Sequence, residues 1–332
     1  MATALRLGTR RSALAVAQSS QVARALSAAS GREVTLVPIV SEGDVSRASL
    51  AAIGGTGIFA TRLREALLND ECDLLVHSLK DLPTAQPPGL VIGAVPVRED
   101  ARDVVVTRDG TPLNDLPEGS VVGTGSPRRV AQIHRRNHRV TVQDLRGNVD
   151  SRVARVRDGE LDAVILAAAG LRRLEGTAAD LQLEELGLAE WPTAPGQGAL
   201  AVEIRDDAPD DLRAAIALLD DASTRIAVAA ERAVLSTLEA GCHAPVAAHA
   251  ALSGDDLRIH AVAYALDGSR RVGLDRTVPL LPGYARIPGS GNGADAADGA
   301  NPIARAARAG TDVARRLLER GAADIVPRES TP

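Results

Sequence analysis

The pattern of apolar and polar residues changes at about Ala222. Before that point, short β-branched runs alternate with amphipathic helical patterns, which is typical of mostly parallel sheets with helices on both faces. The predicted helices lie at about Ala13–Ala29, Ile58–Asn69, Pro127–Arg136 and Val149–Arg157. The predicted strands are Leu5–Leu7, Val34–Val40, Leu74–Val76, Leu90–Val95, Val104–Thr107, Val121–Gly123, Val140–Val142 and Ala163–Leu166. This part of the chain is therefore predicted to be α/β.

The rest of the chain is predicted to form a small antiparallel α+β unit. A long helical pattern begins at about Thr224, and Gly241 is expected to end it in the left-handed conformation. The stretch 282–301 is rich in Gly, Ala, Asp and Ser and is expected to be a disordered insert. Three further strands and a last helix are predicted at Val246–Leu252, Leu257–Ala265, Arg271–Pro279 and Ile303–Arg320.

Length and composition are those of a globular protein in a reducing compartment. The 332 residues allow two or three domains. Two cysteines, Cys72 and Cys242, are too few for a disulfide framework. No apolar run approaches the roughly 18 residues of a membrane span, and we recognise no secretory signal. We therefore expect a cytoplasmic protein without a membrane partner, and no exposed apolar helix suggests more than a monomer.

Arginines gather just after the predicted strands, where ligands bind in α/β sheets. Between residues 121 and 155 there are eight arginines and two acids, in a chain of net charge −5. Each arginine alone could be a solvated surface charge. As a set at successive strand ends, they favour a ligand with several negative groups, because guanidinium forks match carboxylates or phosphates. The candidates are Arg10, Arg11, Arg128, Arg129, Arg146, Arg152 and Arg173.

A small, multiply carboxylated molecule fits this set better than nucleic acid. Single-strand binders need aromatic stacking platforms, and the chain has only one Phe, one Trp and two Tyr. No duplex-reading motif is recognisable. Cys242 and the adjacent His243 would be only half a zinc site, so we expect no metal.

Lys80 and Asp81 follow the predicted strand Leu74–Val76 and are the acid–base candidates. Lys80 is the only lysine among 38 Lys and Arg residues, and its compact ammonium differs chemically from a guanidinium. The Asp81 carboxylate could stabilise a developing cation and relay a proton in the arginine-lined cleft. The structural alternatives for Asp81 are a helix cap or a salt bridge to Lys80.

Cys242 is predicted to lie on an exposed loop just after a helix C-terminus. The helix dipole and Glu239 both oppose a thiolate there, so the thiol is accessible without being activated. Such a thiol suits permanent covalent attachment better than turnover as a nucleophile. The alternative is a free cysteine without a role.

Several motifs in register resemble the porphobilinogen deaminase (hydroxymethylbilane synthase) family. The resemblance runs in order from about residue 4 to residue 321, and independent motifs carry it. They are Thr9-Arg10-Arg11-Ser12, His77-Ser78-Leu79-Lys80-Asp81-Leu82-Pro83, Gly123-Thr124-Gly125-Ser126-Pro127-Arg128-Arg129, Leu145-Arg146-Gly147-Asn148, Gly196-Gln197-Gly198 and Glu239-Ala240-Gly241-Cys242.

The resemblance implies three domains. Two are doubly wound α/β lobes similar to those of periplasmic binding proteins, comprising residues 1–96 plus about 199–215, and residues 97–198. The third is a small C-terminal α+β domain, residues 216–332, which carries the cysteine loop.

The resemblance also implies a reaction and a set of residues for it. A dipyrromethane cofactor, bound to Cys242 as a thioether, primes the head-to-tail condensation of four porphobilinogens with loss of ammonia. Hydrolysis then releases the linear tetrapyrrole hydroxymethylbilane, for haem biosynthesis. Asp81 is the implied catalytic residue, which would stabilise the azafulvene-like cation left by deamination. The implied cofactor contacts are Lys80, Ser126, Arg128, Arg129, Arg146 and Ser12, and the implied substrate contacts are Arg10, Arg11, Arg152, Arg173, Phe59 and Gln197.

The sequence departs from the family in the glycine-rich segment near residue 55. Many members carry lysines there, where this chain has Ala52 and Thr56, so anion contacts from this segment are in question. The competing hypothesis is a non-catalytic, two-lobed binding module for a small dicarboxylate.

Overall fold

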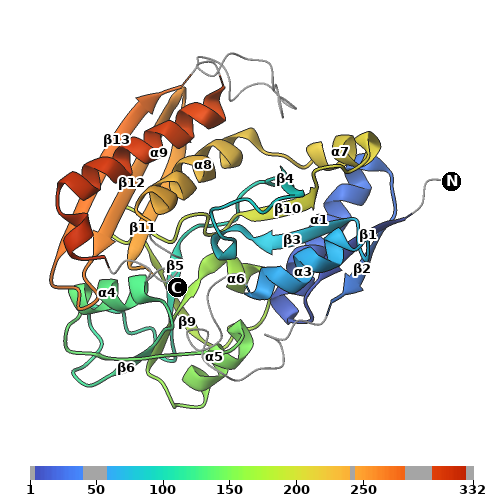
Figure 1. Cartoon of the computed structure of the whole chain (residues 1–332). Helices are drawn as coiled ribbons and strands as arrows, with labels where there is room; N and C mark the ends of the chain where they lie inside the picture. Colours follow the sequence, from blue (N-terminus) through green and yellow to red (C-terminus); the bar gives the residue numbers. More distant parts are fainter. Residues whose placement is uncertain (1–3, 40–57, 240–243, 281–300, 327–332) are drawn as a thin grey trace.

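The fold is taken from a computed structural model, which describes residues 4–39, 58–239, 244–280 and 301–326. Three separate sheets organise these residues, two of five strands and one of three. Figure 1 shows the two five-stranded sheets with their helices, and the three-stranded sheet packed beneath two long helices.

The first sheet has the strand order β2-β1-β3-β10-β4. Strands β1, β2 and β3 are parallel, whereas β10 runs antiparallel to both β3 and β4. A strand from near residue 200 is thus inserted into a sheet built from the first 94 residues. The strands are β1 (Leu5–Thr9), β2 (Val34–Pro38), β3 (Leu74–Ser78), β4 (Leu90–Ala94) and β10 (Leu200–Arg205). The helices with it are α1 (Ala13–Ser30), α3 (Ile58–Leu68) and α7 (Asp210–Ala217), and the 3-10 turn η1 (Leu79–Asp81) follows β3.

The second sheet repeats this plan, with the strand order β7-β6-β8-β5-β9. Here β6, β7 and β8 are parallel, and β5 is the antiparallel strand in fourth place. The strands are β5 (Asp103–Thr107), β6 (Val121–Gly123), β7 (Thr141–Gln143), β8 (Ala163–Ala167) and β9 (Gln182–Leu186). The helices are α4 (Pro127–Arg136), α5 (Val149–Arg157) and α6 (Ala168–Arg173).

The third sheet is the antiparallel meander β11 (Val246–Ser253), β12 (Asp256–Tyr264) and β13 (Arg271–Pro279). Alternate residues of β11 and β12 form its core with α8 (Ala222–Thr237) and α9 (Pro302–Glu319), and the turn η3 (Ala322–Asp324) follows α9. Residues of the opposite face, Ala247, Val262 and Tyr264, pack against Ala131 of α4. The third unit is therefore attached to the second sheet's unit through α4.

The predicted fold class is confirmed: two doubly wound, mostly parallel α/β lobes and a small antiparallel α+β unit. Two local predictions need correction. The helix predicted to end at Gly241 ends at Thr237, and Glu239 adopts the left-handed conformation with φ 50°; Gly241 lies outside the described residues. Strands β9 and β10 and helices α6 and α7 were not predicted. Within the described ranges, no helix has both the length and the hydropathy needed to cross a membrane.

Gly310 allows α8 and α9 to pack closely. A Cβ on Gly310 would lie 2.2 Å from the carbonyl oxygen of Ala230, a backbone atom that cannot turn away. We predict that Gly310→Ala lowers the free energy of unfolding by about 1–3 kcal/mol, since overpacking outweighs the gain in helix propensity. Urea denaturation measures this loss.

Gly170→Ala is the matched control for this prediction. Gly170 is also helical, but its added Cβ would meet nothing closer than 3.7 Å. This variant should be as stable as the parent protein or slightly more stable. Equal stability of both variants would contradict the close packing of α8 on α9.

Candidate active site

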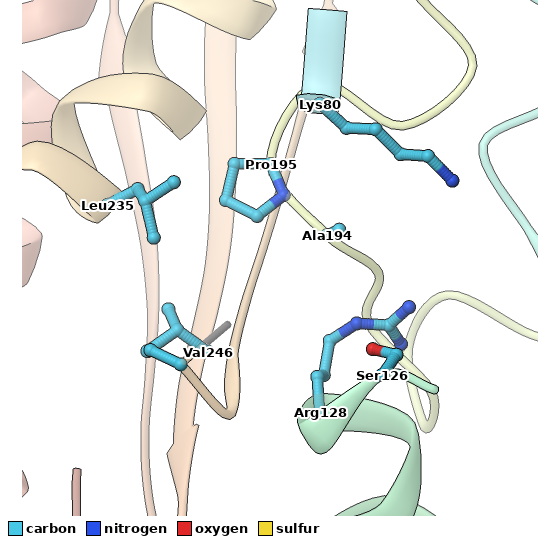
Figure 2. A pocket seen from close by; sticks show the side chains of 8 residues that line it. Lys80, Ser126, Arg128, Ala194, Pro195, Leu235 and Val246 are labelled. Atoms are coloured by element: carbon cyan, nitrogen blue, oxygen red, sulfur yellow. The ribbon is translucent and has the colours of Figure 1, made fainter. Parts of the chain in front are cut away.

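A pocket lies where the three units meet (Figure 2). It spans about 320 Å³, a volume that includes space open to solvent. Lys80 comes from the turn after β3, Ser126 and Arg128 come from the start of α4, and Leu235 and Val246 come from the third unit. Ala194, Pro195 and Ala244 complete the lining. Two cations and a hydroxyl thus lie beside apolar side chains, an arrangement that suits an anion with an apolar body.

The turn η1 positions Lys80 and Asp81. The amide of Leu79 donates to the carbonyl of Ala199 at 3.0 Å, and the Leu79 side chain is buried beneath the turn. Lys80 is half-buried and lines the pocket, whereas Asp81 is exposed at the end of the turn. Burial lowers the pKa of Lys80, and the neighbouring charge of Asp81 opposes that shift. Asp81 itself does not line this pocket, so its predicted role in the cationic cleft stays a prediction.

The two serines in front of α1 and α4 behave differently. Ser12 caps α1, because its hydroxyl accepts from the amide of Ala15 at 3.4 Å. Ser126 occupies the equivalent place before α4, with Pro127 in the first turn, but its side chain makes no capping hydrogen bond. The Ser126 hydroxyl therefore does not cap the helix, and Ser126 lines the pocket instead.

Arg128 and Arg129 are not surface residues: their side chains are only 3% and 7% exposed. Both converge on the fully buried carboxylate of Asp103. Arg129 Nη2 lies 2.6 Å from Oδ1, and Arg128 Nη2 lies 2.9 Å from Oδ2. The Trp191 Nε1 and Gln197 Nε2 groups also donate to this carboxylate, at 2.9 and 2.8 Å. Burial alone would raise the pKa of Asp103, but the two guanidinium charges and these donors hold it far below its usual range.

This cluster contains two buried cations and one buried anion. Arg129 uses Nε and Nη2 on Asp103 and Nη1 on the carbonyl of Ile165. Arg128 retains a buried Nε with no partner among the described residues, and this side chain lines the pocket. An uncompensated buried charge is costly, so the cluster favours an additional anion. Burial also lowers the pKa of Arg128, against the effect of Asp103.

Gln197 belongs to the same buried cluster. Its Nε2 donates to the carbonyl of Ala101 at 2.8 Å as well as to Asp103. Only its Oε1 lacks a partner in the part of the chain that the structure describes. The structure thus engages Gln197 in holding Asp103, and its predicted contact with substrate remains a prediction.

Arg146 and Arg152 differ in their exposure and in their partners. Arg146 is exposed and lies 3.3 Å from Asp144, while Arg152 is half-buried and donates to the carbonyl of Gly147 at 2.9 Å. Burial lowers the pKa of Arg152, and the charges of Arg129, Arg146 and Asp81 also act on it, which places these groups near one another. That all seven candidate arginines share one ligand site stays a prediction.

Three further candidate arginines are not part of the lining of this pocket. Arg173 donates from Nη2 to the carbonyl of Gly198 at 2.8 Å, and burial lowers its pKa. Arg10 is half-buried and Arg11 is exposed, both at the turn between β1 and α1. Cys242, Ala52 and Thr56 lie outside the described residues, as does the side chain of Phe59.

A second buried carboxylate, Glu231 of α8, holds the segments that connect the units. It pairs with Arg98 at 2.7 Å, and it accepts from the amides of Gly196 at 2.6 Å and Ala250 at 2.7 Å. Sequence reasoning missed both Asp103 and Glu231. The available signal was weak: each is an acid within or beside an apolar pattern, which indicates a buried partner without naming it.

The fold and this pocket define a three-unit protein with a buried cationic site for an anionic ligand. A family model described as porphobilinogen deaminase, dipyromethane cofactor binding domain, matches residues 5–213, and the C-terminal domain of the same family matches residues 225–277. The porphobilinogen deaminase of Leifsonia xyli subsp. xyli is 48% identical, over 98% of this chain and 94% of the relative. Porphobilinogen deaminase 1 of Streptomyces coelicolor is 54% identical, over 83% of this chain and 89% of the relative. This chain belongs to the porphobilinogen deaminase family.

The chain also aligns with solved structures. One of them is a periplasmic substrate-binding protein of an ABC transporter from Coxiella burnetii, which aligns with this chain with a TM-score of 0.41 and 13% sequence identity. The alignment covers 64% of this chain and 90% of that chain.

The Asp103 cluster predicts a pH-dependent loss of stability. We expect Asp103→Asn to lower the free energy of unfolding at pH 7 by about 3–5 kcal/mol, because two buried guanidinium groups lose their counter-charge. Since the folded-state pKa of Asp103 is depressed, its contribution is present above the unfolded pKa of about 4 and is lost as the pH falls below it. The acid side of the stability profile should therefore be flatter in Asp103→Asn.

Urea denaturation between pH 3 and pH 7 tests this, with Asp115→Asn as control. Asp115 is exposed and belongs to the same unit, so its substitution should change stability by less than about 0.5 kcal/mol. A loss below about 1 kcal/mol in Asp103→Asn would show that the carboxylate is not the counter-ion described.

Proposed function

We propose that this protein is a hydroxymethylbilane synthase that condenses four porphobilinogens into a linear tetrapyrrole. The observation that carries the proposal is the pocket of Lys80, Ser126 and Arg128, with its surplus buried positive charge and an Arg128 Nε that has no partner among the residues described. Porphobilinogen carries an acetate and a propionate, so a chain of such units has many carboxylates. The site provides donors of the kind that bind them.

The donors that line the pocket also suit the carboxylates of the family's dipyrromethane cofactor. Ala244 lines it and follows Cys242 by two residues, a link that reaches at most about 7 Å, so a thioether on Cys242 would be within reach. Lys80, Ser126 and Arg128 would hold the cofactor's carboxylates, with Ser12, Arg129 and Arg146 nearby in the proposed assignment. When bound, dipyrromethane supplies the pyrrole to which new units are joined.

The remaining candidates would act on the substrate. Arg10, Arg11, Arg152 and Arg173 would bind its acetate and propionate groups, together with Phe59 and Gln197 as further proposed contacts. Asp81 is exposed at the end of η1 and close enough to Arg152 to affect its pKa. Its carboxylate would stabilise the cation that forms as ammonia leaves, and would accept a pyrrole proton.

We further propose that the units correspond to domains of residues 1–96 plus about 199–215, 97–198 and 216–332. The return of β10 to the first sheet supports the split first domain. We propose a monomer in the cytoplasm. A non-catalytic dicarboxylate-binding module is not favoured, because the third unit contributes Leu235, Ala244 and Val246 to the pocket and a simple two-lobed binder has no need of such a unit.

The covalent cofactor gives a direct test by intact mass. The purified protein should weigh more than its sequence by two condensed pyrroles, and Cys242→Ser should lack this excess. Cys72→Ser is the matched control, because the Cys72 thiol is buried and burial raises its pKa to about 11, so it should retain the excess. An unmodified and inactive wild-type protein would end the proposal.

Asp81→Ala tests the proposed catalytic group. Because Asp81 is exposed, the variant should fold and keep the cofactor mass, while kcat falls by about 10²–10⁴-fold. Assays of tetrapyrrole formation, quenched at set times, measure this loss, with the exposed Asp115→Ala as control. Turnover near the parental rate would show that Asp81 does not have this role.

A further inference from the structure

Arg128 is connected to the third unit by a short chain of buried hydrogen bonds. Its Nη1 donates to Gln132 Oε1 at 2.6 Å, and Gln132 Nε2 lies 3.3 Å from the hydroxyl of Tyr264 at the end of β12. Gln132 and Tyr264 are 3% and 1% exposed. This contact crosses from α4 to the third sheet, and neither residue is among those assigned to the reaction above.

The chemistry of the partners allows only one orientation of the Gln132 amide. Gln132 Nε2 also donates to the carbonyl of Pro192 at 2.9 Å, and a carbonyl can only accept. Arg128 can only donate, so the amide oxygen must face it. Gln132 is therefore fixed on both sides, and it fixes one end of the Arg128 guanidinium while Asp103 fixes the other. Within the described ranges, the Nε of Arg128 remains without a partner.

The third sheet also holds α4 by direct packing. Ala131 contacts Ala247, Val262 and Tyr264. Gly268, in the turn after β12, lies so close to α4 that a Cβ there would be 2.6 Å from the carbonyl oxygen of Ala131. The helix that carries Arg128 is thus seated on the unit that contributes Ala244 and Val246 to the same pocket.

We propose that Gln132 and Tyr264 are positioning residues that hold Arg128 in its pocket-facing conformation and make it depend on docking of the third unit. The role assigned to Arg128 rests on the proposed function, but its positioning does not. Arg129 is an internal reference, because it shares Asp103 with Arg128 and has no hydrogen bond to Gln132.

The test compares how fast phenylglyoxal modifies Arg128 and Arg129, mapped by peptide mass spectrometry. It uses the full chain with Cys242→Ser, so that no thioether-bound cofactor can cover either arginine. In Gln132→Met, modification of Arg128 should become roughly tenfold faster, since a hydrogen bond to a charged group is lost. Arg129 should keep its rate. The exposed Gln21→Met should match the parent.

Tyr264→Phe removes a single hydroxyl. It tests the positioning of Arg128 if Gln132→Met fails to fold. It should speed the modification of Arg128 alone, by a smaller factor. An unchanged rate at Arg128 in these variants, or an equal rise at Arg128 and Arg129, would overturn the proposal, because the second result indicates general loosening.

A second readout uses the chain with Cys242 intact. Gln132→Met should carry the dipyrromethane mass on a smaller fraction of molecules than the parent, and Gln21→Met should carry it on the parental fraction. If Gln132→Met carried the dipyrromethane mass on the same fraction of molecules as the parent, the link to the cofactor would be overturned. If the wild-type protein carries no such mass, the proposed function fails, while the modification rates still decide whether Arg128 is positioned as described.

Discussion

The site depends on one imbalance of charge: two buried guanidinium groups share a single buried carboxylate. Asp103 keeps Arg128 and Arg129 charged inside the protein, but it cannot neutralise both. Low-dielectric surroundings make the remaining charge expensive unless an anion approaches. The donors of Trp191 and Gln197 strengthen Asp103 as an acceptor and leave it no freedom to move. Attraction for carboxylates is therefore built into the core of the second lobe.

The second constraint is that no single unit contains the whole pocket. Lys80 depends on the turn after β3, Arg128 on α4, and Val246 on the third sheet. Glu231 holds the connecting segments together through Arg98 and the amide of Gly196, so the relative position of these parts is set by buried polar contacts. The ligand site is in this sense a property of the assembled chain.

Much of the fold could be predicted from the sequence, and the reason for each failure is physical. Helices α4 and α5 coincide with their predicted ranges, because strong local signals mark their ends. Strand β10 was missed because Glu203 interrupts its apolar pattern, and only the tertiary contact with Arg64 and His77 makes that buried charge acceptable. Strand β9 was missed because its sequence, Gln-Leu-Glu-Glu-Leu, is polar and largely exposed.

The positive charge of the site could be predicted from the sequence, but the separate roles of its arginines could not. The excess of arginines pointed to an anionic ligand, and Lys80, Ser126 and Arg128 do line one pocket. The sequence could not separate arginines that face a ligand from those that neutralise Asp103, because Arg128 and Arg129 lie 25 and 26 residues from that carboxylate along the chain. Spacing within a motif carries no information about such distant pairings.

Lys80 has a practical consequence, because it is the only lysine in the chain and lies in this pocket. Acylating or aldehyde reagents that select primary amines would find one side-chain target in the whole molecule. A lysine whose pKa is lowered by burial presents more of its neutral, nucleophilic form near neutral pH. A fluorophore or photo-crosslinker could thus be attached beside the ligand without any engineered residue.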